Sequence, residues 1–333
     1  MVRKNIELAH RKISERMNIE KLAMSVATKL FLNKLPEKQK KKLVELYHNT
    51  AISILVRKCG IEWGKIGNKI YVEKGGKTII TSTNDSLFNI VKGFDSIFKI
   101  KELNIKNDTI DFTKDVQFLG YRVKTLAESL LWTKPILEEY NKYYKIKGGD
   151  IVFDCGAHHG LYSLLISRAV GKNGMIYCFE PDDENYRILT GNVRKNGIKN
   201  IKVVKMGLWS GKGRALFRTN LGHSSHIIIG TSANARKKNI ESIRLTTIAD
   251  FSKEMKLKKI DFMKMDIEGA EIEAIEGSLA FIKNNSVNFA IASYHIRENK
   301  PTALRLEKLF KSIGYWVSTE KNSAGELITY AHQ

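Results

Sequence analysis

Three acidic residues follow one apolar segment of the sequence at a spacing that could do chemistry. Asp266, Glu268 and Glu271 come directly after the apolar run IDFMKM. Carboxylates at the end of a buried strand cost free energy unless they are paired, solvated or used in a site. We therefore expect a functional site here, with Asp266 and Glu268 as catalytic candidates. The alternative is that Asp266 and Glu268 cap a helix and that Glu271 lies on a solvated face.

A glycine-containing turn, DCGAHHG, follows a second apolar segment. Glycines permit a tight turn and a close approach to a ligand, so Gly156, Ala157 and Gly160 are predicted to bind a nucleotide-type cofactor. His158 takes the place of the second glycine in the G-x-G-x-x-G fingerprint, which disfavours NAD. The carboxylate of Asp154 would repel phosphate but suits a cationic group, such as the methionine ammonium of S-adenosylmethionine (AdoMet).

Glu180 ends the next apolar segment, MIYCFE. An acidic group in this place, one strand after a glycine loop, can accept both hydroxyls of a ribose. The alternative is that Glu180 only caps the helix that begins near Asp182. We favour the ribose role, because the loop and the acid occur together in adenosine-binding folds.

Histidine provides a candidate for proton transfer. His295 follows Ser293-Tyr294 at the end of the apolar segment VNFAIASY, and its near-neutral pKa makes it a candidate general base beside Asp266. A structural hydrogen-bonding role is the alternative. The pairs His158-His159 and His223/His226 could ligate a metal ion, but their spacing matches no metal template, so no metal site is predicted.

The elements that must position these residues alternate between strand and helix from Asp150 onward. This alternation predicts an α/β fold with a mostly parallel sheet covered on both faces. The segments YWVSTE and ELITYAH, on either side of Asn322 to Gly325, predict a terminal antiparallel hairpin. Lys264 interrupts the apolar strand before Asp266, and we expect it to pair with a carboxylate or to extend outward.

The pattern of apolar residues, glycines and prolines along the sequence divides the chain into three predicted parts. Residues 1–58 are expected to form a helical arm interrupted at Pro36, residues 59–123 a small β-rich region, and residues 124–333 the catalytic domain. The fold class is therefore a parallel α/β domain preceded by a smaller α+β region. The first two parts are expected to select the acceptor or to form oligomer contacts.

Composition limits the class of protein. The 333 residues contain no apolar run of about 18, so neither a membrane span nor an export signal is expected. Cys59, Cys155 and Cys178 are too few and too scattered for a disulfide framework, which favours a reducing cytoplasm. The net charge of +21 would suit an anionic partner such as RNA, although the lysines are spread along the whole chain.

Residues 150–332 resemble the FkbM family of AdoMet-dependent methyltransferases. The resemblance rests on DCGAHHGLYS, FEPDDENYRILTGNV, LTTIADF, IDFMKMDIEGAEIEAIEG and GYWV. It implies a class I, Rossmann-like methyltransferase fold that binds AdoMet, with Asp154, Gly156 and Gly160 shaping the methionine loop and Glu180 on the ribose. It also implies a place beside cofactor or acceptor for Asp266, Glu268 and Glu271. Where this chain has His158, the family commonly has asparagine.

The predicted activity is O-methylation of a hydroxyl on a sugar, a glycan or a related small acceptor, as the resemblance implies. Gly207 and Leu208, after the third strand, are predicted to contact the adenine through backbone and side chain. Two alternatives stay open: an RNA methyltransferase that uses the basic surface, and an inactive protein that binds cofactor or nucleic acid. The sequence identifies neither the acceptor nor the oligomeric state.

Overall fold

The computed structural model describes residues 60–82, 87–100, 108–219 and 240–333, together with Val56, Leu103, Ile105, His226 and Ile227. The chain divides into two compact units, residues 1–61 and 62–333. The helical arm expected over residues 1–58 lies outside the described residues apart from Val56. The boundaries near residues 58 and 123 stay predictions, and the features below belong to the second unit.

A seven-stranded sheet forms the centre of the C-terminal half, in the order β18-β19-β15-β14-β7-β8-β9. Strands β9, β8, β7, β14 and β15 are parallel, whereas β19 runs antiparallel to both β15 and β18. This arrangement confirms the predicted α/β fold with its terminal antiparallel hairpin. The strands span Ile151–Cys155 (β7), Met175–Phe179 (β8), Ile201–Val204 (β9), Phe262–Met265 (β14), Asn288–Ala292 (β15), Trp316–Lys321 (β18) and Leu327–His332 (β19).

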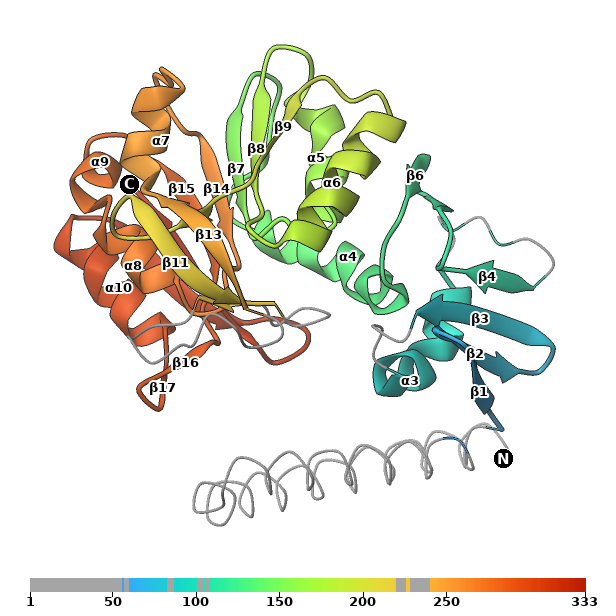
Figure 1. Ribbon diagram of the computed structural model, residues 1–333. Helices are drawn as coiled ribbons and strands as arrows, with labels where there is room; N and C mark the ends of the chain where they lie inside the picture. Colours follow the sequence, from blue (N-terminus) through green and yellow to red (C-terminus); the bar gives the residue numbers. More distant parts are fainter. Residues whose placement is uncertain are drawn as a thin grey trace, which may run out of the picture. The chain divides into compact units, whose positions relative to one another are not determined.

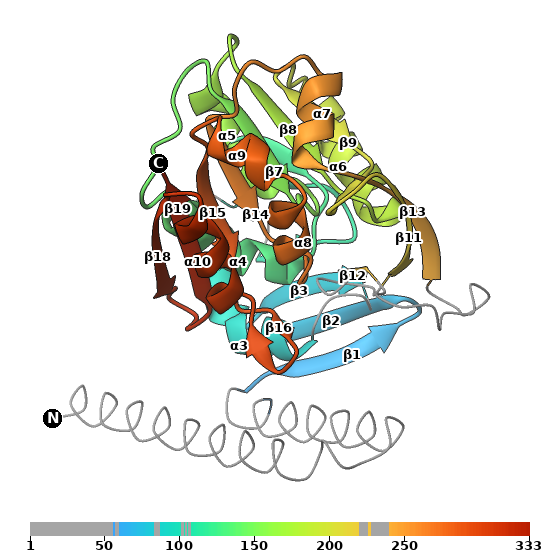
Figure 2. The same ribbon diagram turned by 90° about the vertical axis from the view of Figure 1, so that its left-hand side faces the viewer.

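Helices cover both faces of this sheet, because its central strands are apolar on both sides. Helices α5 and α6 lie on one face, and α8, α9 and α10 lie on the other (Figures 1 and 2). Their bounds are Leu161–Val170 (α5), Asp183–Lys195 (α6), Ile248–Glu254 (α7), Glu271–Glu276 (α8), Leu279–Lys283 (α9) and Ala303–Ser312 (α10). The two-sided cover leaves the ends of the strands as the places where loops can form a site.

Three phenylalanines pack against one another at the centre of the core. Phe153 of β7, Phe179 of β8 and Phe251 of α7 are at most 3% exposed, and their ring centroids lie 4.7 to 5.6 Å apart. Phe251 meets the other two rings in edge-on geometry, which favours aromatic pairs beyond the area they bury. The strands that carry the glycine loop and Glu180 are therefore held on a rigid base.

The strand order reverses between β7 and β14, which are neighbours in the sheet. In open α/β sheets, ligands bind beyond the carboxyl ends of the strands at such a reversal. The two segments that follow these strands meet there, since the backbone N–H of Asp266 donates to the carbonyl oxygen of Cys155 at 2.9 Å. The fold thus brings the predicted glycine loop and the predicted acidic cluster to one place.

A second sheet, in the order β10-β13-β11-β12, was not expected from the sequence. After β9 the chain leaves the main sheet, and Gly207 pairs in parallel with Leu245. The strands are short or irregularly spaced, so no long alternating pattern marks them. Their bounds are Gly207–Leu208 (β10), Gly213–Arg218 (β11), His226–Ile227 (β12) and Ile240–Thr246 (β13).

The region before the main domain contains the expected strands and one helix that was not expected there. Strands β1 to β4 form a sheet in that order, and the hairpin β5–β6 follows. The unexpected helix, α3 (Leu87–Phe98), buries Ile90, Val91, Phe94 and Ile97 at helical spacing. The other bounds are Glu62–Ile66 (β1), Lys69–Lys74 (β2), Lys77–Ser82 (β3), Thr109–Asp111 (β4), Val116–Phe118 (β5), Tyr121–Val123 (β6) and Ala127–Tyr140 (α4).

One predicted helix is two in the structure. The segment AEIEAIEGSLAFI forms α8 and α9, separated at Gly277 and Ser278. A Cβ atom on Gly277 would lie 2.3 Å from the Cα of Ser210, so the backbones approach closely at this break. After β15, a small hairpin of β16 (Ile296–Arg297) and β17 (Lys300–Pro301) leads into α10.

Among the described residues, no helix has both the length and the apolar character needed to cross a bilayer. Cys155 and Cys178 are free and buried, and Cys59 lies outside the described residues.

Candidate active site

The loop after β7 is built on Gly156. Its φ is +75°, and a Cβ atom there would lie 1.9 Å from the carbonyl oxygen of Asp266, a distance that no side chain tolerates. The N–H groups of Gly156 and Ala157 both donate to the carbonyl oxygen of Phe179, at 3.0 and 3.1 Å. Glycine is therefore required because three backbone segments converge, and the convergence joins the ends of β7, β8 and β14.

Asp154 lies beneath this loop rather than on an open surface. Its side chain is fully buried, accepts a hydrogen bond from Ser163 Oγ at 2.6 Å and pairs with Lys264 Nζ at 3.2 Å. Lys264 also donates to the carbonyl oxygen of Gly156 at 2.8 Å. Burial lowers the pKa of Lys264, but the charges of Asp154 and Asp266, with the hydrogen bond to Asp154, together outweigh it and leave that pKa above its ordinary value. The pair anchors the loop from below.

Glu180 is held by backbone donors on either side. Its Oε2 accepts from the N–H of His158 at 2.8 Å and its Oε1 from the N–H of Asp182 at 3.1 Å. Burial raises the pKa of Glu180 to about 7, although both backbone bonds act in the opposite direction. The capping alternative is wrong for this residue, because Asp182 is the N-cap of α6 and accepts from Glu184 N and Asn185 N.

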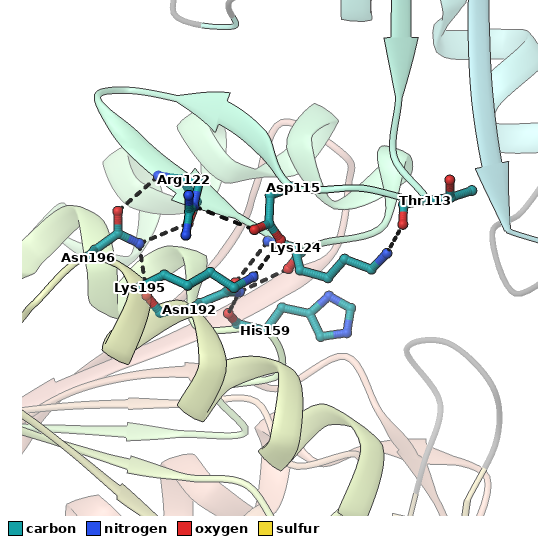
Figure 3. A network of polar contacts seen from close by, with 8 residues as sticks. All are labelled: Thr113, Asp115, Arg122, Lys124, His159, Asn192, Lys195 and Asn196. Atoms are coloured by element: carbon teal, nitrogen blue, oxygen red, sulfur yellow. Dashed lines mark hydrogen bonds and ion pairs between the residues drawn. The ribbon is translucent and has the colours of Figure 1, made fainter.

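Asn192, on α6, holds the loop from the other side and was missed by the sequence analysis. It is fully buried, and its Nδ2 donates to the carbonyl oxygens of Lys124 and His159, both at 2.9 Å. Its Oδ1 accepts from the N–H of Lys124 at 2.8 Å. One helical turn on, Asn196 bonds both backbone groups of Arg122 (Figure 3). The two asparagines dock the strand β6 and the segment after it on α6.

The acidic cluster is arranged by Glu271. This side chain is fully buried, and its Oε1 accepts from the N–H groups of Ile267 and Gly269 at 3.1 and 3.2 Å. The alternative interpretation, that Glu271 lies on a solvated face, is therefore wrong. Helix α8 has Ala270 as N-cap and no side-chain cap, so Glu268 does not cap it either. Glu268 instead adopts a φ of +57° at the turn.

His295 faces this cluster. Its Nδ1 lies 3.0 Å from Glu271 Oε1, and its Nε2 lies 3.6 Å from both Asp266 Oδ1 and Glu268 Oε2. Burial lowers the pKa of His295, but the close contact with Glu271 and the charges of the other two carboxylates raise it to about 9. In this state the imidazole is protonated near pH 7. It cannot then act as a general base without first losing that proton.

Tyr140, on α4, also contacts the cluster and was not singled out in the sequence. Its hydroxyl donates to Asp266 Oδ2 at 3.4 Å, and its side chain is buried. Burial, followed by the charge of Asp266, raises the pKa of Tyr140 well above its ordinary value. The phenol therefore stays a donor and fixes one oxygen of Asp266.

These segments enclose a cavity of about 420 Å³, a size typical of sites for small molecules. Of the predicted site residues, seven line it: Gly156, Ala157, Glu180, Gly207, Leu208, Asp266 and Glu268. The lining does not include Asp154, Gly160, Glu271 or His295. The remaining lining includes Asn89, Ser129, Glu139, Tyr140, His158, His159, Lys264, Tyr294, Asn322, Ser323 and Glu326.

The lining fits an adenosine-containing cofactor with a cationic end. Glu180 presents a buried carboxylate to the cavity with no cation paired to it among the described residues, as hydrogen bonding to ribose hydroxyls requires. Apolar Leu208 and Phe179 line the cavity as well and can cover a purine ring. The residues that would hold AdoMet are thus present.

The pair His158–His159, considered above as metal ligands, forms a ring stack in the structure. His158 and His159 stack on each other with ring centroids 3.7 Å apart, and His159 Nδ1 lies 3.2 Å from Thr125 Oγ1. His223 lies outside the described residues, and of His226 only the backbone is described.

Comparisons with known proteins agree with the resemblance. Residues 154–317 match the profile described as the methyltransferase FkbM domain. The methyltransferase sdnD of Sordaria araneosa is 23% identical over 185 residues, which cover 47% of this chain and 71% of that protein.

Solved structures of other methyltransferases are similar to this chain at lower sequence identity. The methyltransferase FkbM from Methylobacillus flagellatus KT is 20% identical, with a TM-score of 0.42 over 73% of this chain and 60% of that one. An AdoMet-dependent methyltransferase from Aquifex aeolicus is 16% identical, with a TM-score of 0.35 over 60% of this chain and 95% of that one. This chain thus spans 60% of the length of the M. flagellatus protein, and the fold assignment rests on strand order. The matched segment, which contains the glycine loop, Glu180 and the acidic cluster, is an FkbM methyltransferase domain, and the methyl donor that such a domain implies is AdoMet.

Proposed function

We propose that this chain methylates a hydroxyl group of a sugar, a glycan or a related small polyhydroxylated acceptor. The observation that carries the proposal is the charge of the cavity lining. Five carboxylates line it, from Glu139, Glu180, Asp266, Glu268 and Glu326, against a single lysine or arginine, Lys264, among the described residues. Carboxylates accept hydrogen bonds from hydroxyl groups and repel phosphates.

Lys264 does not offset this charge for a ligand. Its Nζ is bound to Asp154 and to the carbonyl oxygen of Gly156, and its side chain is 7% exposed. An RNA acceptor would bring phosphates toward a lining that repels them. The net charge of +21, which motivated the RNA alternative, is therefore not a property of the cavity.

Individual residues receive proposed roles from their contacts. Glu180 accepts the ribose hydroxyls, while Gly156, Ala157 and Gly160 shape the loop around the methionine end. Gly207 and Leu208 contact the adenine. Asp154 acts through Lys264 as an anchor of the loop, so it positions rather than binds.

The reaction needs an acceptor oxygen in line with the methyl group and a path for its proton. Bound AdoMet supplies the electrophilic methyl group. The acceptor oxygen forms the new C–O bond, the C–S bond breaks, and its electron pair stays on the sulfur of the leaving S-adenosylhomocysteine. The hydroxyl proton leaves toward the cluster of Asp266, Glu268 and His295, where Oδ1 of Asp266 has no hydrogen-bond partner among the described residues. In-line alignment and proton handling by this cluster together constitute the proposed catalysis.

The test is transfer of a labelled methyl group from AdoMet to two acceptor panels, one of mono- and oligosaccharides and one of RNA. We expect label in a saccharide product that survives mild alkali, as an ether does and a methyl ester does not. Labelled RNA with unlabelled saccharides would overturn the proposal. Saturable AdoMet binding without transfer to either panel would favour the inactive binding protein.

A further inference from the structure

We propose that Asp266, Glu268 and His295 form a binding site for a divalent transition-metal cation. The three side chains each direct one ligand atom to a common point, and these atoms all lie within 4.8 Å of one another. They come from two different loops, after β14 and after β15, so the convergence is a product of the fold. No metal was expected here, because the sequence offered only the histidine pairs as candidate ligands.

The orientation of His295 is the first argument. Its Nδ1 lies 3.0 Å from Glu271 Oε1, and Glu271 is fixed by two backbone donors. In the neutral imidazole, a carboxylate 3.0 Å from Nδ1 favours the proton on that nitrogen, so that the lone pair is on Nε2 and can bind a cation that displaces the second proton. This carboxylate–histidine pair is the arrangement that supports histidine ligands in metal sites.

The second argument is the absence of hydrogen bonds where they are expected. The side chain of His295 is 10% exposed, and neither its two ring nitrogens nor Oδ1 of Asp266 has a hydrogen-bond partner among the described residues. Buried polar atoms without partners are rare, so each such case requires an explanation. The distance between His295 Nε2 and Asp266 Oδ1 is 3.6 Å, which is too long for a hydrogen bond.

That spacing suits a shared cation. Metal–ligand bonds of about 2.0 to 2.2 Å place neighbouring ligands of a tetrahedral ion about 3.4 Å apart. The distances from His295 Nε2 to Asp266 Oδ1 and to Glu268 Oε2 are both 3.6 Å. Only small side-chain movements are needed to close the site.

The donor set selects the kind of ion. Imidazole nitrogen suits Zn²⁺, Fe²⁺ and related ions, whereas carboxylates alone suit Mg²⁺ and Ca²⁺. One imidazole with two carboxylates is therefore expected to prefer Mn²⁺ or Zn²⁺ over Ca²⁺. Three protein ligands also leave coordination positions open, and both Asp266 and Glu268 line the cavity.

The use of the ion rests on the proposed function. A divalent cation lowers the pKa of an oxygen that it binds by several units, so an acceptor hydroxyl would lose its proton near neutral pH. With the ion bound, this proton would pass to water instead of to Asp266, Glu268 or His295, which would then be ligands. The same ion would orient the acceptor beside Asp266. This would explain how a site whose histidine is held by three carboxylates can still methylate a hydroxyl.

The competing explanation is that the imidazole is simply protonated and forms ion pairs with all three carboxylates. Titration of the full chain with Mn²⁺, after treatment with chelator and followed by the electron paramagnetic resonance signal of free Mn²⁺, distinguishes the two. We expect one Mn²⁺ per chain. Glu268→Gln and His295→Gln are expected to weaken binding at least tenfold, the effect usual for changes at metal sites. Glu276→Gln is the matched control, since Glu276 lies on α8 but pairs with Arg305.

Equal Mn²⁺ affinity in the wild type and in both site variants, with folding verified by circular dichroism, would overturn the proposal. So would the absence of Mn²⁺ and Zn²⁺ binding to the wild type. Methyl transfer is measured separately with and without chelator. Full transfer in chelator would refute the role of the ion while leaving the methyltransferase proposal intact, whereas Mn²⁺ binding without any AdoMet binding would refute the latter alone.

Discussion

The protonation of Glu180 should control cofactor affinity. Burial raises its pKa to about 7 in the free protein, and ribose hydroxyls can donate only to an oxygen that is free to accept them. Binding therefore favours the ionised form, which is the major form above pH 7 and the minor form below it. With a pKa of about 7, the ionised fraction falls about tenfold between pH 8 and pH 6, and affinity should fall by the same factor.

The assay must avoid other titrating groups on the ligand. The α-amino group of AdoMet titrates at about 7.7 to 8.0, so 5′-methylthioadenosine, which keeps the ribose and lacks the amino acid, is the appropriate probe. Its dissociation constant is measured by calorimetry at pH 6, 7 and 8. Glu180→Gln should bind weakly and lose the pH dependence, whereas His158→Asn, next to the carboxylate, should keep it. An unchanged affinity from pH 6 to 8 in the wild type would refute the reasoning, as would the same slope in Glu180→Gln.

Three further predictions concern the loop and its supports. Gly156→Ala should cost at least about 2 kcal/mol of stability and abolish 5′-methylthioadenosine binding, because the new Cβ meets the Asp266 carbonyl. The control Gly191→Ala, in open space on α6, should not destabilise the protein. Equal melting temperatures for the two variants would contradict this. Asn192→Ala removes the side-chain partner of three backbone groups, one buried and two part-buried, and should cost about 2 to 4 kcal/mol by urea denaturation. A loss below about 0.5 kcal/mol would count against the docking role. Removal of residues 1–115 should impair acceptor methylation more than AdoMet binding, because Asn89 of α3 lines the cavity; equal loss of both through unfolding would defeat this expectation.

Local patterns predicted the main sheet well. Continuous apolar runs that end in glycine or an acid marked β7, β8 and β14, and the doubly covered parallel sheet followed from their alternation with helices. Helix α3 was missed even though its buried residues have helical spacing, because the surrounding segments are short, β-rich and separated by glycine turns. The sheet of β10 to β13 has no local signal, since its pairing joins segments far apart in the chain.

Partners at long range explain what the sequence could not predict in the site. Asp154 was expected to meet a cation, and it does, but the cation is Lys264 of the neighbouring strand. The two residues are direct register partners between β7 and β14. Both strands were predicted, whereas their adjacency and register were not. Asn192 and Tyr140 carry no pattern that distinguishes them from other polar residues on helices, because their partners are backbone atoms or carboxylates of distant segments.

The charge of the cavity therefore depends on which carboxylates are paired with cations, and the net charge of the sequence does not predict it. Asp154 is neutralised by Lys264, and Glu271 by its contact with His295. Among the described residues, five carboxylates line the cavity against one lysine, so a chain with a net charge of +21 encloses an acidic cavity. A ligand with a positive centre is stabilised there, whether the centre is a sulfonium, an ammonium or a bound metal ion. A polyphosphate is disfavoured by the same charges, so the net charge of the chain does not predict what the cavity binds.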